Sequence, residues 1–169
     1  MPKARERASL PSHFPKRVYT EKEVEEARKC VTQGFKHSLR VDGSLEFKQE
    51  VKETLEFIKT AEYYDFLRTY IRDIIEIEGF SQLREAEVAL WIDKELLRDP
   101  LDAAGVFVQK AQQMKDFLEG KPFYGGMGET NAVKKRLEFL RSLKERSKDP
   151  KAKQRCEEIL KSYAESAFF

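Results

Sequence analysis

Five carboxylates gather in the middle of this 169-residue chain, and they are the side chains best placed for catalysis or metal binding. Paired carboxylates serve general acid–base catalysis, and glutamates in helical bundles hold di-metal centres together with Glu-x-x-His motifs. Neither His13 nor His37, the two histidines, follows a glutamate by three residues. We therefore expect no catalytic residue, metal site or cofactor, and we interpret the carboxylates as a solvated or salt-bridged surface. The five are Glu76, Glu78, Glu85, Glu87 and Asp93.

The two cysteines give no sign of nucleophilic or metal chemistry either. Cys30 and Cys156 lie near opposite ends of the chain, and no Cys-x-x-Cys pair occurs. Both fall at or beside apolar positions of predicted helices, where a thiol packs as a small apolar group. This usage favours free thiols in a reducing compartment, so we expect a cytoplasmic protein.

The segment 120–131, GKPFYGGMGETN, is the longest irregular stretch that the sequence predicts, and it holds four glycines. A glycine-rich loop ahead of a helix can bind phosphate through backbone N–H groups. The GxxxxGK[ST] pattern of nucleotide-binding loops is absent, however. The segment is therefore either a hinge or a binding loop, in which Lys121 would supply the charge.

A third candidate is a crevice beside the aromatic residues of the central stretch. Tyrosines, arginines and the single tryptophan could converge there on a small ligand, as polar and aromatic groups do in ligand pockets. The alternative is that the aromatic rings belong to the core. The candidate residues are Tyr63, Tyr64, Arg68, Arg84 and Trp91.

Charge is unevenly distributed along the chain. Residues 1–19 carry a net charge of +4 and residues 134–169 of +5, whereas the middle carries −7 within a total of +2. A basic face favours nucleic acid or another polyanion, although aromatic residues are not interleaved as single-strand binders require. The alternative is that these cations pair with the acidic middle. The candidate polyanion-binding residues are Lys134, Lys135, Arg136, Arg141, Lys144, Arg146, Lys151, Lys153 and Arg155.

Apolar spacing predicts that helices position all of these groups. Phe47, Val51, Leu55 and Ile58 recur at helical steps. A second stripe continues from Tyr63 to Ile77, so the stretch from Ser44 to Glu78 is one kinked helix or, as we prefer, two, with Thr60 as the second N-cap. Ser81 is expected to begin a further helix that carries Trp91.

Capping signals predict the remaining helix starts. Thr20 with Glu23 forms a capping box, and Asp99–Pro100 and Asp149–Pro150 each place an N-cap before a proline at the first helical position. Thr130 is expected to cap a further helix. With no alternating run long enough for a sheet, the sequence predicts an all-α, single-domain bundle of six or seven helices.

The expected organisation has four parts. Residues 1–19 form a flexible basic arm, residues 20–119 a helical core, residues 120–130 the glycine-rich loop, and residues 131–169 a C-terminal helical hairpin packed on the core. No apolar run reaches the roughly 20 residues that a membrane span needs, so no membrane partner is expected.

Residues 81–91, SQLREAEVALW, resemble the first helix of the helix-turn-helix domain of quorum-sensing-type response regulators. The resemblance rests on Arg84, Glu85, Glu87, Val88 and Trp91. It implies a helix here, but the second, base-reading helix has no counterpart in the residues that follow. No DNA-reading residue is therefore carried over.

These observations favour a non-catalytic interaction or scaffold module that binds a protein partner, with the oligomeric state left open. The first alternative is a nucleic-acid or other polyanion-binding protein that uses the basic C-terminal tract. The second is a small-ligand-binding protein or enzyme with a site near the helices of residues 60–91.

Overall fold

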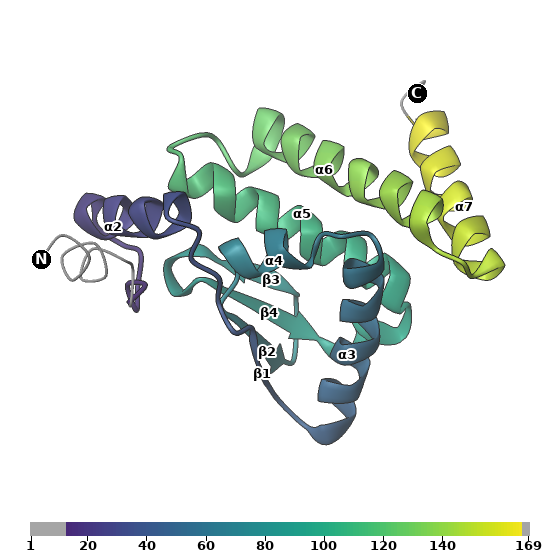
Figure 1. Ribbon diagram of the computed structural model, residues 1–169, viewed down its shortest axis with the longest axis horizontal. Helices are drawn as coiled ribbons and strands as arrows, with labels where there is room; N and C mark the ends of the chain where they lie inside the picture. Colours follow the sequence, from purple (N-terminus) through teal and green to yellow (C-terminus); the bar gives the residue numbers. More distant parts are fainter. Residues whose placement is uncertain (1–12, 167–169) are drawn as a thin grey trace, which may run out of the picture.

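The expected all-α fold is wrong: helices dominate, but they pack on a four-stranded mixed sheet. A computed structural model describes residues 13–166 (Figure 1). Over those residues the chain forms, in order, one helix, one short strand, two helices, three more strands and three long helices. The sheet occupies the middle of the sequence, where the predicted helices were longest.

The sheet has the order β1-β2-β4-β3. Strands β1 (Arg40–Asp42), β2 (Asp73–Ile77) and β4 (Ala89–Asp93) run parallel, and β3 (Gln82–Arg84) pairs antiparallel with β4 at the edge. Consecutive strands β2 and β3 are thus separated by β4, which inserts between them. Asp73, Ile74 and the residues after them pair in register with Ala89, Leu90 and their successors.

The helices expected over residues 71–77 and 81–97 are wrong for an identifiable reason. The spacing of three between Ile71, Ile74 and Ile77 imitates a helical stripe, but β-branched isoleucines favour strands. The stretch that resembles a helix-turn-helix is instead β3, a 3₁₀ turn (Glu85–Glu87) and β4. Val88, with a left-handed φ of 57°, ends that turn.

Six α-helices lie within the described residues, and several of the predicted starts are confirmed. The Thr20–Glu23 capping box is present, Asp99 accepts a hydrogen bond from the Asp102 backbone, and the last helix begins at Pro150. The expected cap at Thr60 is wrong, because that residue ends a helix. The helices are α2 (Glu21–Thr32), α3 (Leu45–Thr60), α4 (Tyr64–Tyr70), α5 (Pro100–Leu118), α6 (Gly125–Arg146) and α7 (Pro150–Ser166), and a 3₁₀ helix, η2 (Lys94–Arg98), precedes α5.

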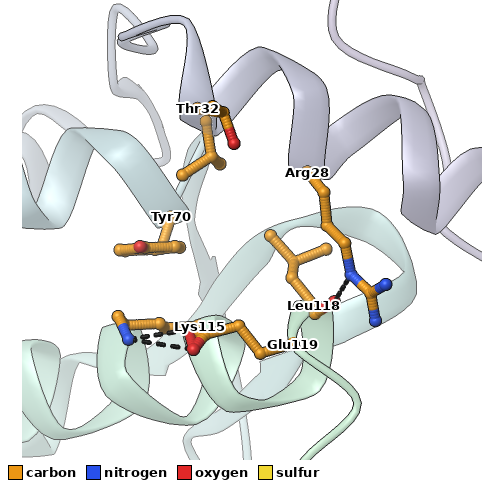
Figure 2. A pocket seen from close by; sticks show the side chains of 7 residues that line it. Arg28, Thr32, Tyr70, Lys115, Leu118 and Glu119 are labelled. Carbon is orange, nitrogen blue, oxygen red and sulfur yellow. Dashed lines mark hydrogen bonds and ion pairs between the residues drawn. The ribbon is translucent and has the colours of Figure 1, made fainter.

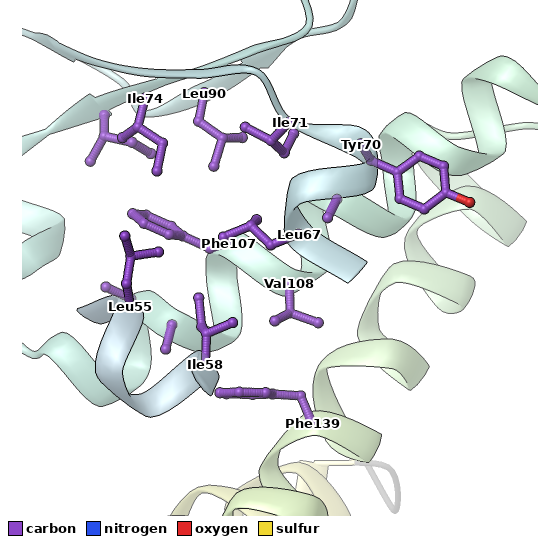
Figure 3. Close-up of a cluster of buried hydrophobic side chains, with 14 of the residues drawn as sticks. Leu55, Ile58, Leu67, Tyr70, Ile71, Ile74, Leu90, Phe107, Val108 and Phe139 are labelled. Carbon is purple, nitrogen blue, oxygen red and sulfur yellow. The ribbon is translucent and has the colours of Figure 1, made fainter. Parts of the chain in front are cut away.

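The core lies between one face of the sheet and helices α3, α4 and α5 (Figure 3). The side chains of Ile74 on β2 and Leu90 on β4 point toward Phe107 of α5, and Ile58 of α3 lies on the other side of the Phe107 ring in the same cluster. On its far side α5 is covered by α6, which contributes Phe139. Helix α5 is therefore buried on most of its circumference, which explains its small residues and its weak amphipathic pattern.

The glycine-rich segment mostly belongs to α6. The helix begins at Gly125, kinks at Gly126 and contains Thr130, so the expected cap at Thr130 is wrong. Gly128 lies directly on the Phe123 backbone, where a Cβ atom would approach the Phe123 carbonyl carbon to 2.5 Å. The glycines thus allow a tight return of the chain onto α5.

The described part of the basic N-terminal segment contacts the residues that precede β2 and β4, at the amino ends of these strands. The Arg72 guanidinium donates hydrogen bonds to the carbonyls of Pro15 and Lys16, and the Val18 backbone donates to Ala86. Val18 is fully buried. Residues 1–12, which carry much of the predicted arm, lie outside the described residues.

Among residues 13–166, every helix falls short of the length or the apolarity that crossing a bilayer would require.

Candidate functional site

The five residues predicted to line a crevice make two separate sets of contacts. On α4, the Arg68 guanidinium lies 5.4 Å from the centre of the Tyr64 ring, and Tyr63 packs edge-on against a phenylalanine of α6. On the sheet, the Arg84 guanidinium stacks 4.2 Å above the Trp91 ring. None of the five lines any of the hollows described below.

Two of the five central carboxylates accept hydrogen bonds from the backbone, while Glu87 pairs with Arg84 and Glu85 accepts a hydrogen bond from the Tyr124 hydroxyl. Glu76 accepts a hydrogen bond from the Ser44 N–H at 2.9 Å, and Asp93 accepts from Gly79 and Glu95, each at 2.9 Å. The bonds from the backbones of Glu95 and Gly79 lower the pKa of Asp93. Within residues 13–166, no three His, Cys, Asp or Glu side chains come together as metal ligands would. Glu76 and Asp93 therefore stabilise the carboxyl ends of the parallel strands.

Six of the ten basic residues of α6 and α7 are held in ion pairs, among them Lys161 with Glu165. Three of those pairs reach back to the acidic middle: Arg136 to Asp102, Arg146 to Glu62, and Arg155 to Asp99. Lys135 and Lys144 pair within the hairpin. The cations without an ion pair among the described residues are Lys134, Arg141, Lys148, Lys151 and Lys153.

The largest surface feature of the hairpin is a groove between α6 and α7, which diverge in Figure 1. It consists of two adjoining hollows of about 660 and 420 Å³ that share Arg141 and Leu160. From α6, the residues Val133, Leu137 and Arg141 recur at steps of four, so they lie along one face. The residues lining the two hollows are Val133, Leu137, Arg141, Lys144, Glu145, Lys153, Glu157, Leu160, Tyr163, Ala164 and Ser166.

The groove has a charged end and an apolar end. Near the loop that joins the two helices, Lys144 and Glu157 form a 3.2 Å ion pair across the groove. Arg141 and Lys153 line the same hollow and have no acidic partner among the described residues. Toward the open end the lining becomes apolar, with valine, leucine, alanine and the tyrosine ring.

A partly buried ion pair fixes α6 relative to α5 and so positions the groove. The Arg136 side chain is only 12% exposed, and its guanidinium lies 2.6 Å from an Asp102 oxygen and 3.1 Å from Gln109 Oε1. Gly105 leaves room for it, because a Cβ atom there would lie 2.9 Å from Arg136 Nε. The same guanidinium lies 5.7 Å from the Tyr163 ring centre, which orients the aromatic wall of the groove.

A second, smaller hollow of about 240 Å³ lies where α2, the end of α4 and the end of α5 meet (Figure 2). Its wall combines apolar surface with hydroxyl and charged groups. Arg28 donates a hydrogen bond from Nε to the Leu118 carbonyl, and Lys115 pairs with Glu119 at 2.6 Å. The lining residues are Arg28, Val31, Thr32, Tyr70, Lys115, Leu118 and Glu119.

No known protein family, curated protein or solved structure matches this chain. The groove between α6 and α7 and the smaller hollow beside Tyr70 are therefore the candidate sites.

The groove partly coincides with the predicted polyanion-binding tract. Arg141, Lys144 and Lys153 come together in it, whereas Arg136 and Arg155 lie in ion pairs with α5 and its N-cap. The sequence analysis named none of the apolar members of the groove as candidate site residues, because only the pairing of α6 with α7 brings them together.

Proposed function

We propose that this protein is a non-catalytic interaction module that binds an acidic amphipathic helix of a partner protein in the groove between α6 and α7. The observation that carries the proposal is the pair of adjoining hollows, apolar at one end and lined by the unpaired cations Arg141 and Lys153 at the other. Helix-in-groove recognition uses such surfaces, because apolar anchors spaced along one helix face enter the groove.

The apolar lining supplies the affinity for such a helix. Leu137, Leu160 and Tyr163 pack against the core with one side and remain partly open to the groove. Burying the rest of their surface is favourable by about 25 cal/mol for each Å² removed from water. A partner with leucines along one face would complete that burial.

The charged end supplies orientation and selectivity. Arg141 and Lys153 form no ion pair among the described residues, and the hollow that they line holds three cations against Glu145 and Glu157, so a partner with glutamates at the corresponding end meets a complementary potential. Polyanion binding is the less favoured alternative, since three of the candidate cations already pair with the acidic middle and one end of the groove is lined mainly by apolar side chains.

The test is fluorescence anisotropy with a labelled helical peptide of about 15 residues, which is roughly as long as α7 at about 1.5 Å per residue. The peptide carries leucines along one face and glutamates on the flanks, and a matched peptide carries lysines in place of the glutamates. We expect the glutamate peptide to bind and the lysine peptide to bind at least about tenfold more weakly.

Two variants locate the binding. Arg141→Glu should weaken the glutamate peptide by about tenfold, whereas Lys148→Glu, an equal charge reversal at an exposed unpaired lysine outside the groove, should leave it unchanged. Equal losses in both variants would assign the effect to net charge. Tight heparin binding with no peptide binding would replace the proposal by the polyanion alternative.

A further inference from the structure

We propose that the hollow between α2 and α5 beside Tyr70 is a binding site for a small monocarboxylate with one flat apolar ring. The hollow is separate from the groove, and neither shares a lining residue with the other. The inference is therefore independent of the proposed function.

Hydroxyl groups without a protein partner line the hollow. Tyr70 is only 8% exposed, yet its hydroxyl makes no hydrogen bond with any described residue. The Thr32 hydroxyl, on α2 opposite, also has no partner within residues 13–166, and Thr32 is exposed (Figure 2). Neither hydroxyl is a buried group without a partner, so both can exchange water for a ligand that enters the hollow and accepts their hydrogen bonds.

The charges around the hollow favour a single negative charge. Arg28 and Lys115 bring two positive charges, and Glu119 brings one negative charge that already pairs with Lys115. Arg28 uses Nε to bind the Leu118 carbonyl, which holds the guanidinium in place and leaves its two amino groups without a described acceptor. A guanidinium fixed in this way presents a planar fork that suits a carboxylate.

The size and the walls of the hollow define the rest of the ligand. A volume of about 240 Å³ lies just below the range of pockets that hold drug-sized molecules, so it suits one ring with a short substituent. Val31, Leu118 and the face of the Tyr70 ring supply the apolar walls. The site thus differs from a phosphate site, which would need more charge and less apolar surface.

The test is ligand-observed and protein-observed NMR on the full chain with benzoate, phenylacetate and, as the neutral counterpart of benzoate, benzamide. For ligands of this size we expect a Kd of about 1 mM for the better carboxylate and binding of benzamide that is weaker by about tenfold. The amide signals that shift should belong to residues around 28–32, 70 and 115–119.

Two variants that remove single groups test the assignment without disturbing the fold. Tyr70→Phe and Thr32→Val delete hydroxyls that bond no described residue, so stability should be unchanged while carboxylate binding falls about threefold to tenfold. Tyr63→Phe, the same change on α4 outside the hollow, should have no effect. The inference is overturned if neither carboxylate binds at 10 mM (about tenfold above the expected Kd), if benzamide binds as well as benzoate, or if Tyr70→Phe binds like the unmodified chain.

Discussion

Replacing His37 with phenylalanine should remove a specific loss of stability at mildly acidic pH. His37 is only 3% exposed, and its ring packs edge-on against Phe14 at 4.6 Å and against Phe35 at 5.0 Å. Burial, together with the nearby positive charges of Arg72 and Arg68, lowers the pKa of His37 from 6.5 to about 4, and only Asp73 opposes this. The folded state therefore holds the ring neutral.

The size and direction of the effect follow from this difference. Below pH 6.5 His37 is protonated in the unfolded chain but stays neutral in the folded chain. The contribution of His37 to the free energy of unfolding is therefore fully present above pH 6.5 and is lost as the pH falls toward about 4. One pKa unit corresponds to about 1.36 kcal/mol, which gives a loss of about 3 kcal/mol from this residue. The variant His37→Phe keeps an aromatic ring packed against Phe14 and Phe35, and this ring cannot titrate.

The assay is urea unfolding, followed by the fluorescence of Trp91, the only tryptophan. It is repeated at several pH values between about 7.5 and 4, a range that covers the pKa of His37 in the unfolded and in the folded chain. Carboxylates titrate in both proteins, so the informative quantity is the difference in unfolding free energy between them. We expect this difference to shift by about 3 kcal/mol in favour of His37→Phe as the pH falls. Parallel curves, within about 0.5 kcal/mol, would refute the reasoning, as would an NMR titration that places the pKa of His37 near 6.5.

Three further substitutions test the packing that positions the groove. Arg136→Ala should cost about 1–2 kcal/mol, which lowers the melting temperature by about 2–8 °C, because it removes the hydrogen bonds of the Arg136 guanidinium to Asp102 and Gln109, while Asp102, 35% exposed, is rehydrated by water; an unchanged melting temperature would contradict this. Gly128→Ala should cost about 2–3 kcal/mol through the clash with the Phe123 backbone, measured by chemical unfolding, and an unchanged free energy of unfolding would contradict this. Phe107→Ala should cost about 3–5 kcal/mol, because it empties the centre of the core, and a loss below about 1 kcal/mol would place that centre elsewhere.

The sequence predicted helix ends better than it predicted the sheet. Capping depends on local chemistry, so the starts at Thr20, Asp99 and Asp149–Pro150 were readable within a few residues. The strands are only three to five residues long, and the isoleucines in and just before β2 recur every three residues, a spacing that a helix would also show. A run of isoleucines followed by Gly79 at a turn was the signal that could have indicated strands.

The candidate sites depend on contacts between segments far apart in the sequence, which is why patterns identified them only in part. The basic tract was visible, but its division into paired and unpaired cations is set by Glu62, Asp99 and Asp102 of other elements. The hollow of Figure 2 joins Thr32, Tyr70 and Lys115 from three helices, and no spacing along the chain relates them.

The most direct test of the central claim is hydrogen–deuterium exchange of the protein with and without the glutamate peptide, at a peptide concentration that saturates the anisotropy signal. Binding in the groove predicts slower exchange in the segments of α6 and α7 around residues 133–145 and 153–166, with the sheet and α2 unchanged. Protection confined to the sheet or to α2, or no protection in either helix while the peptide is bound, would contradict the account.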